Sequence, residues 1–325
     1  MLENVSFIIP VYNTELDKFI RCIDSIEQIN NKNCELIVID DGSFEDFSKE
    51  YSIFLKKYKN IKYYKNLNNG VSYSRNFGID HSSKKYVMFV DSDDYLLYDE
   101  LNNINVSLDY DIILFNHINI CNDKEIKYSF DEGIILWDDL IVDHARKGSV
   151  SSPCSKLYKL SFLNKNHLRF KTNYVQGEDA YFNLECLSFK PTIFYYNHPI
   201  YLYDYSPDST IKRWDKNFDK ALEGKYDIYF KKMEIIDKLN LNNEKILLDI
   251  ENDFVDKTMH SYLMILELND KGKIKKYTNK FNESNINYKH LKTKEKIYYH
   301  LIRNKSRLTK KILKIMNRIK NKKKR

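Results

Sequence analysis

Apolar residues in the first 95 positions recur with two different periods, one typical of strands and one typical of helices. Short runs rich in β-branched and aromatic residues predict four strands: Val5–Ile9, Glu35–Ile39, Ile61–Tyr64 and Tyr86–Val90. The first two runs are apolar at nearly every position, as expected for strands that are covered on both faces.

Between these strands the apolar spacing changes to three and four residues. The segment Glu15–Ile29 places Leu16, Phe19, Ile20, Ile23 and Ile26 on one helical face. A second helix is predicted over Phe44–Tyr58, and Gly70–Asp80 joins the third and fourth strands. Alternation of strand and helix predicts a doubly wound α/β domain, with a mostly parallel sheet and right-handed crossovers.

The rest of the chain is less regular at first and then becomes helical. Asp111–Phe115 and Thr192–Tyr196 are predicted strands, and Asp179–Phe189 is a predicted helix. From Asn217 onward the sequence has no proline and has long amphipathic stretches. We expect a first domain over residues 1–215, a helical region over 216–300 and a separate tail over 301–325.

The charge of the chain is concentrated in that tail. The 53 Lys and Arg exceed the 46 Asp and Glu by seven, and twelve of the basic residues lie between Leu301 and Arg325, where no acidic residue occurs. Removing these twelve leaves 41 basic against 46 acidic side chains, a net charge of −5 for residues 1–300. A nucleic-acid-binding protein carries its basic patch on the folded domain, so no nucleic-acid partner is expected.

Within the tail, Leu308, Ile312, Ile315 and Ile319 recur at spacings of three and four, with lysine and arginine between them. A basic amphipathic helix of this kind predicts binding to an anionic membrane surface. An oligomerising helix, a solvated disordered end and nucleic-acid contact are the alternatives.

Cysteine use and hydropathy narrow the expected location. The five cysteines are far apart and never form a CxxC pair, which favours buried, reduced thiols over disulfides or a zinc site. The N-terminus lacks the basic region of a signal peptide, and no stretch approaches 18 uncharged apolar residues. The expectation is a cytoplasmic protein, held at the inner face of the cell membrane by its tail.

Each of the four predicted strands ends in a polar loop. These loops are Pro10-Val11-Tyr12-Asn13, Asp40-Asp41-Gly42-Ser43, Asn68-Asn69-Gly70 with Arg75-Asn76, and Asp91-Ser92-Asp93-Asp94. Ligands of open parallel sheets bind beyond the carboxyl ends of the strands, so the four loops predict one site.

The fourth loop carries the clearest chemistry. Residues i and i+2 of an extended segment project to the same side, so Asp91 and Asp93 can face one ligand while Asp94 turns away. Paired carboxylates suit Mg²⁺ or Mn²⁺, with an ordinary acidic turn as the alternative. No GxGxxG or GxxxxGK[ST] motif occurs, which disfavours a Rossmann dehydrogenase or a P-loop NTPase.

The ordered motifs FIIPVYN (7–13), VIDDGS (38–43), NNGVSYSRNFG (68–78) and FVDSDD (89–94) resemble the family-2 glycosyltransferases of the GT-A fold. The resemblance continues through SPCSKLY (152–158), QGEDAYFNLECL (176–187) and PIYLYDYSPDSTIKR (199–213), where it is to bacterial capsule, lipopolysaccharide and teichoic-acid transferases. It implies that residues 1–215 form the catalytic domain, with a nucleotide-binding half over 1–95 and an acceptor half over 96–215.

The resemblance also implies a role for each loop residue. Tyr12 would stack on the nucleotide base, and Asp40 or, more typically, Asp41 would accept a hydrogen bond from uracil N3–H. Asp93 would be the direct metal ligand, with Asp91 near the metal and the ribose. The implied contacts to the nucleotide sugar are Pro10, Tyr12, Asp40, Asp41, Asn68, Arg75, Asp91, Ser92, Lys212 and Arg213.

Several of these assignments leave an alternative open. By resemblance Asp179 is the catalytic base, but an aspartate at a helix start is also a common cap, and Glu178 could be the functional acid. Arg75 could instead pair with a carboxylate at the sheet end. The segment with Lys212 and Arg213, expected to close over the diphosphate, could be a basic surface loop, and Lys156 could line the acceptor side or be structural.

The resulting hypothesis is an inverting, metal-dependent glycosyltransferase that uses Mn²⁺ or Mg²⁺. It would move a sugar from a UDP-sugar to a hydroxyl of a saccharide or lipid-linked saccharide at the cell surface. A non-catalytic membrane-associated scaffold and a sugar nucleotidyltransferase are the rivals. A homo-dimer is possible, and the sugar, the acceptor and the linkage stay open.

Overall fold

The computed structural model describes residues 4–28, 34–97, 100, 109–147, 150–174, 176–204, 218–241, 243–268 and 270–304. The chain divides into two compact units. The first contains the described residues up to 204, apart from 145–147, 174, 176 and 177; these and the described residues from 218 onward form the second. The domain boundary expected at 215/216, the residues Lys212 and Arg213, and the tail from 305 onward lie outside the described residues.

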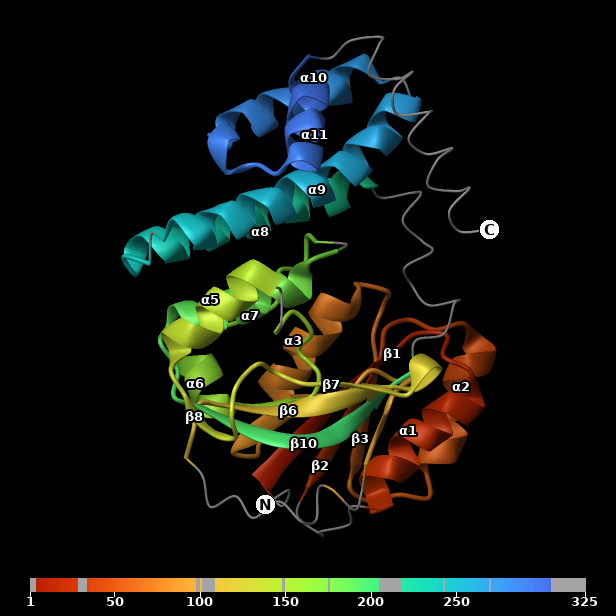
Figure 1. The fold of residues 1–325 in the computed structure, drawn as a ribbon. Coiled ribbons are helices and arrows are strands. Elements are labelled where there is room, and N and C mark those ends of the chain that lie inside the picture. Colours follow the sequence, from red (N-terminus) through yellow and green to blue (C-terminus); the bar gives the residue numbers. More distant parts are fainter. Residues whose placement is uncertain are drawn as a thin grey trace. The chain divides into compact units, whose positions relative to one another are not determined.

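The described strands of the first unit form one sheet (Figure 1). The order of its strands is β3-β2-β1-β4-β9-β6-β10-β5. In addition, β7 pairs with β6, and β8 pairs with β10. The strands are β1 (Val5–Val11), β2 (Glu35–Asp40), β3 (Ile61–Lys65), β4 (Tyr86–Phe89), β5 (Tyr95–Leu96), β6 (Ile112–Asn119), β7 (Lys124–Ile126), β8 (Gly133–Ile135), β9 (Lys156–Lys159) and β10 (Ile193–Tyr203).

The sheet is parallel where the sequence alternates between strand and helix. β1 pairs with β2 and β4, and β2 pairs with β3, all in parallel. β9 lies antiparallel between β4 and β6, and β6 is parallel to β10. The expected α/β class with a mostly parallel sheet is confirmed, with antiparallel strands entering only after β4.

Helices cover both faces of this sheet. The chain steps outward from β1 to β2 and β3 and then returns to β4 on the other side of β1, so right-handed crossovers reverse the face that the helices cover. Accordingly, α1 and α2 lie on one face and α3 on the other (Figure 1). The helices described for this unit are α1 (Leu16–Gln28), α2 (Glu45–Leu55), α3 (Val71–His81), α5 (Trp137–Lys147, whose last three residues belong to the second unit), α6 (Leu160–Lys165) and α7 (Glu178–Ser188), with a short 3-10 helix η2 (Ile120–Asn122).

The core of the first unit lies between these layers. Every residue of β1 and β2 is buried, which explains why both strands are apolar on both faces. The predicted stripe of α1 faces the core, where Phe19, Ile23 and Ile26 are fully buried. Each such side chain contributes roughly 1.5–3 kcal/mol on burial.

The second unit is helical, as the sequence predicts. It contains α8 (Phe218–Lys238), α9 (Glu244–Leu268), α10 (Lys271–Glu283), the 3-10 helix η4 (Tyr288–His290) and α11 (Thr293–Asn304). Aromatic rings fill its core, where the rings of Tyr229 and Phe254 stack with centroids 4.1 Å apart. Among the described residues, no helix combines the length and hydropathy needed to cross a bilayer.

The cysteines are reduced, and four of them are buried as expected. Cys22, Cys34, Cys154 and Cys186 are buried, whereas Cys121 on η2 is exposed. The expectation of burial is therefore wrong for Cys121. It lies beyond the apolar part of β6, on a polar segment whose backbone is held by the Asn119 side chain.

Candidate functional site

The four polar loops gather at the carboxyl edge of the parallel strands, as expected from the sheet. The hydroxyl groups of Thr14 and Ser92 lie 2.6 Å apart and join the loop after β1 to the loop after β4. Pro10 is buried within β1, and Tyr12 follows it in a partly exposed position. The crevice between β1 and β4, where the sheet order reverses, is the place where open α/β sheets bind ligands.

Backbone contacts connect the other loops. The amide of Asn13 donates to Ser43 Oγ over 3.0 Å, and Asn13 Oδ1 accepts from the amide of Phe44 over 2.8 Å. Gly42 has a φ of +76°, and a Cβ there would lie 2.7 Å from the backbone nitrogen of Asn68. Only glycine permits both this conformation and this approach of the loop after β2 to the loop after β3.

Asp40 and Asp41 differ in their environments. Asp40 is fully buried and accepts hydrogen bonds from the Ser43 amide, the Tyr63 hydroxyl and the Ser48 hydroxyl. The carboxylate of Asp41 accepts the amides of Asn69 and Gly70 over 3.0 and 2.8 Å, and burial raises its pKa. Asp40 has three donors and no exposed surface, so it holds the loop, whereas Asp41 accepts two backbone amides, one on each carboxylate oxygen.

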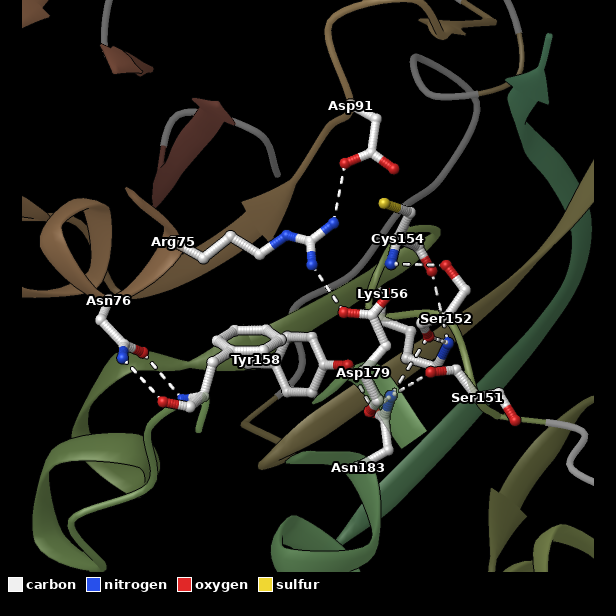
Figure 2. Close-up of polar contacts among 11 residues, drawn as sticks. Arg75, Asn76, Asp91, Ser151, Ser152, Cys154, Lys156, Tyr158, Asp179 and Asn183 are labelled. Carbon is white, nitrogen blue, oxygen red and sulfur yellow. Dashed lines mark hydrogen bonds and ion pairs between the residues drawn. The ribbon is translucent and has the colours of Figure 1, made fainter. Parts of the chain in front are cut away.

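Arg75 links the fourth loop to a helix more than eighty residues further along the chain. Its Nη2 lies 2.8 Å from Asp91 Oδ1, and its Nη1 lies 2.6 Å from Asp179 Oδ1 (Figure 2). The guanidinium is 3% exposed and lies over the Phe170 ring at 5.3 Å. The ion pair considered as an alternative for Arg75 is therefore present, and it joins both carboxylates.

Asp179 lies in the first turn of α7 and points at Arg75 (Figure 2). Burial raises its pKa to about 7, against the lowering effect of the Arg75 charge, and the neighbouring Glu178 and Asp91 raise it further. Its side chain is still 31% exposed, so a ligand can reach it. A carboxylate with this pKa can take up a proton near neutral pH.

Asp91, Asp93 and Asp94 have different surroundings, but residues 91–94 form a turn, closed by the Asp94 amide on the Asp91 carbonyl over 3.0 Å, and not the extended segment expected from the sequence. Asp94 is buried and accepts hydrogen bonds from the Tyr201 hydroxyl over 2.6 Å and the Asp204 amide over 2.8 Å. In Figure 2, one oxygen of Asp91 is turned toward Arg75 and the other away from it. Asp94 thus secures the loop, while Asp91 and Asp93 are available at the site.

The donor set at Asp91 and Asp93 fits a hard divalent cation. Burial and the charge of Asp91 raise the pKa of Asp93, so the two carboxylates repel each other, and a cation would relieve that repulsion. No cluster of three or more potential metal ligands is present among the described residues. A metal bound here would need further ligands, such as the oxygens of a diphosphate.

A network that sequence reasoning missed fixes the start of α7. Asn183 is buried, and its amide nitrogen lies 3.0 Å from the carbonyl oxygens of both Ser151 and Asp179. Its Oδ1 accepts the Tyr158 hydroxyl over 2.7 Å. The sequence signal for this network is an asparagine between the apolar residues Phe182 and Leu184 of a predicted helix. A side chain of this type needs polar partners when it is buried.

Lys156 is structural in this arrangement, which was one of the two possibilities for it. It is buried, burial lowers its pKa to about 8, and it donates to the carbonyls of Ser152 and Cys154. The loop that it holds is the loop to which Asn183 binds (Figure 2). The partners of Lys156 are thus carbonyls of its own segment.

The sequence is similar to those of known glycosyltransferases. Residues 6–111 match the model of the family described as glycosyl transferase family 2. Glycosyltransferase GlyA of Streptococcus pneumoniae is 28% identical over 68% of this chain and 33% of its own length. Poly(ribitol-phosphate) beta-N-acetylglucosaminyltransferase TarP of Staphylococcus aureus is 32% identical over 57% of this chain and 58% of its own.

The fold is also found in a solved structure. The crystal structure of S. aureus TarS 1–349 in complex with UDP-GlcNAc superposes with a TM-score of 0.69 at 17% identity, covering 92% of this chain and 90% of that one. The chain spans only about a third of GlyA and under a fifth of a Rickettsia bellii glycosyltransferase that it matches. Residues 6–111 thus carry the sequence pattern of glycosyl transferase family 2, and the fold of the chain is GT-A.

Proposed function

We propose that the protein is an inverting, metal-dependent glycosyltransferase that moves a sugar from a UDP-sugar to a hydroxyl of a bacterial cell-surface polymer or glycolipid. The observation that carries the proposal is the pairing of Arg75 with both Asp91 and Asp179. This pairing brings the acidic loop after β4 close to the carboxylate of Asp179, which can take up a proton near neutral pH. A donor diphosphate and an attacking hydroxyl would meet between these two groups.

The donor side of the proposal rests on the loops after β1, β2 and β4. Tyr12 would stack on the base, and Asp41 would accept uracil N3–H in addition to the Asn69 and Gly70 amides. Asp91 and Asp93 would hold Mn²⁺ or Mg²⁺, which when bound supplies positive charge to the departing diphosphate. The TarS complex with UDP-GlcNAc supports a UDP-sugar as the donor.

On the acceptor side, Asp179 would remove the proton of the attacking hydroxyl. Arg75 holds its Oδ1, so Oδ2 is the oxygen left for the acceptor. Attack from the face opposite the diphosphate inverts the anomeric centre, and no covalent sugar–enzyme intermediate is needed. The names of the poly(ribitol-phosphate) transferases support a polymer as the acceptor.

The remaining parts of the proposal concern Lys212 and Arg213, which lie outside the described residues, and the tail, of which only residues 301–304 are described, as the end of α11. Lys212 and Arg213 would close over the diphosphate and exclude water. The basic tail from Leu301 to Arg325 would hold the protein at the inner face of the membrane, close to a lipid-linked acceptor.

Replacing Asp179 by asparagine tests the proposal. Asp179→Asn keeps the shape and a hydrogen-bonding oxygen but removes the base, so we expect transfer to fall by roughly 10²–10⁴-fold while UDP-sugar affinity stays nearly unchanged. The measurement is metal-dependent UDP release over a panel of UDP-sugars, with calorimetry for binding. Asp123→Asn, an exposed aspartate beside η2, is the matched control.

Each rival predicts a different result in these assays. Retained turnover in Asp179→Asn would remove this residue from the mechanism and leave Glu178 as the candidate. Release of inorganic diphosphate from a nucleoside triphosphate and a sugar phosphate would indicate a nucleotidyltransferase. Absence of UDP release with every donor and metal would favour the scaffold.

A further inference from the structure

The second unit is divided by charge in a way that its overall composition hides. Helices α8 and α9 carry eleven acidic and seven basic side chains. Residues 271–304, which form α10, η4 and α11, carry ten Lys and Arg and only two acidic residues, Glu283 and Glu295. This part of the unit is therefore strongly basic even without residues 305–325.

Part of that basic charge is organised around aromatic rings. The ring of Tyr288 on η4 lies 5.5 Å from the Tyr299 ring and 5.0 Å from the His300 ring of α11. Lys296 Nζ lies 5.3 Å from the Tyr288 centroid, and the guanidinium of Arg303 lies 5.1 Å from the Tyr299 centroid. We call this set, together with the adjacent Ile297, the η4–α11 face.

The η4–α11 face is accessible to a partner. Tyr288 is 39% exposed and Ile297 is 47% exposed, and both His300 and Arg303 are exposed. Positions 296, 300 and 303 follow one another at spacings of four and three along α11, so they share one side of the helix. The opposite side, with Tyr298, Leu301 and Ile302, is buried in the unit.

Lys296 and Arg303 of this face differ in their partners from other basic residues of the second unit. Lys294 pairs with Asp256, and Lys276 and Lys280 both pair with Glu223. Among the residues that the structure describes, no carboxylate forms an ion pair with Lys296 or Arg303. Lys296 and Arg303 instead contact the side chains of Tyr288 and Tyr299, which carry no negative charge.

We propose that the η4–α11 face is a contact surface for an anionic lipid bilayer. Cationic side chains around partly exposed Tyr and Ile suit the boundary between charged headgroups and acyl chains. The chain continues directly from α11 into residues 305–325, which add eleven basic residues and no acidic one. The proposal extends the membrane association suggested for the tail to the folded unit, and it does not depend on the transfer reaction.

The exposed apolar side chain of Ile297 favours a bilayer over a soluble polyanion as the partner of the η4–α11 face. A phosphate polymer would be held by the basic side chains Lys296 and Arg303 alone. It would gain nothing from the exposed side chain of Ile297. A bilayer interface accepts both kinds of side chain. The same combination recurs in the tail, where Leu308, Ile312 and Ile315 lie among lysines.

The test uses the full chain with Lys296→Glu and Arg303→Glu combined. Binding is measured by co-sedimentation with vesicles of phosphatidylglycerol and phosphatidylcholine, with phosphatidylcholine vesicles as the uncharged reference. Because each basic residue near an anionic surface contributes about 1 kcal/mol, we expect binding to weaken by about tenfold or more although residues 305–325 are unchanged. Added salt should weaken wild-type binding, since exposed charges are screened.

The matched control is Lys238→Glu combined with Lys245→Glu, which changes the net charge equally on exposed positions of α8 and α9. It should bind vesicles like the wild type, and UDP release in solution should be unchanged in both variants. If the charge reversal prevents folding, Lys296→Gln with Arg303→Gln provides the same comparison.

Three outcomes would overturn the proposal. The first is unchanged vesicle binding in the Lys296 and Arg303 variants, and the second is an equal loss in the control. The third is a loss of binding to a soluble polyphosphate with vesicle binding intact, which would assign the face to a polymer. Failure of UDP release in the wild type would instead count against the proposed enzyme and leave this result standing.

Discussion

Arg75 is the residue on which the geometry of the site depends most directly. A guanidinium presents its donors in a fixed planar fork, so one side chain can bind two carboxylates at defined positions. Here it binds Asp91 with one nitrogen and Asp179 with another while being almost fully buried. A lysine carries the same charge as a single ammonium and cannot reproduce this bridge.

We therefore expect Arg75→Lys to lower the transfer rate by about 10- to 100-fold, the equivalent of one charge-assisted hydrogen bond of about 1.5–3 kcal/mol. The pH profile should change as well. Asp179 has to be ionised to act as a base, so the rate should fall as the pH drops below about 7. Because Arg75 lowers the pKa of Asp179, a weaker contact should move this acidic limb to higher pH.

The measurement is the pH dependence of kcat for wild type and Arg75→Lys, with thermal unfolding to confirm that both are folded. An acidic limb at the same pH in both proteins would mean that Arg75 does not control the titrating group. A rate that does not depend on pH between 5 and 8 would argue that Asp179 is not the base.

At the scale of elements, hydrogen bonds of Asn183 help to hold the first turns of α7 in place, in addition to apolar packing. Replacing this residue by leucine would leave the fully buried Tyr158 hydroxyl without its acceptor. An unsatisfied buried group costs about 1–3 kcal/mol, so Asn183→Leu should reduce the free energy of unfolding by about that amount. Transfer should also fall, because Asn183 holds the backbone of Asp179.

Urea unfolding and kcat measured on the same samples check this prediction. Asn279→Leu, at an exposed position of α10, is the control and should change the stability by less than about 0.5 kcal/mol. Wild-type stability in Asn183→Leu would show that apolar packing is sufficient to hold α7.

Elements with a strong local pattern could be predicted from the sequence, and those defined by distant partners could not. The expected strand Asp111–Phe115 is observed, but β6 continues to Asn119 because β10 supplies hydrogen-bond partners beyond the apolar run. β10 likewise passes through Pro199, where the register shifts. Short strands such as β8 and β9 have no local signal and exist through pairing with β10, β4 and β6.

At the scale of the whole molecule, the sequence could place candidate residues on loops but not bring them together. The four loops were predictable, because parallel strands share one carboxyl edge. The meeting of Asp179 with Asp91 was suggested only by family resemblance, since no spacing rule connects positions 91 and 179. The charge division within the second unit was also missed, because a net charge of −5 over residues 1–300 averages over it.

The distribution of cysteines has a practical consequence for the intact protein. Four thiols are buried, and burial raises their pKa values, so they are both shielded and largely protonated. Only Cys121 is exposed. A maleimide should modify one thiol rapidly in the native state and all five after denaturation, which mass spectrometry can count.

Rapid native labelling of two or more cysteines would contradict the burial described here. If a single site reacts, the unaltered chain accepts one fluorophore at η2. Donor binding, closure and membrane contact could then be followed by fluorescence on a protein that needs no engineered cysteine.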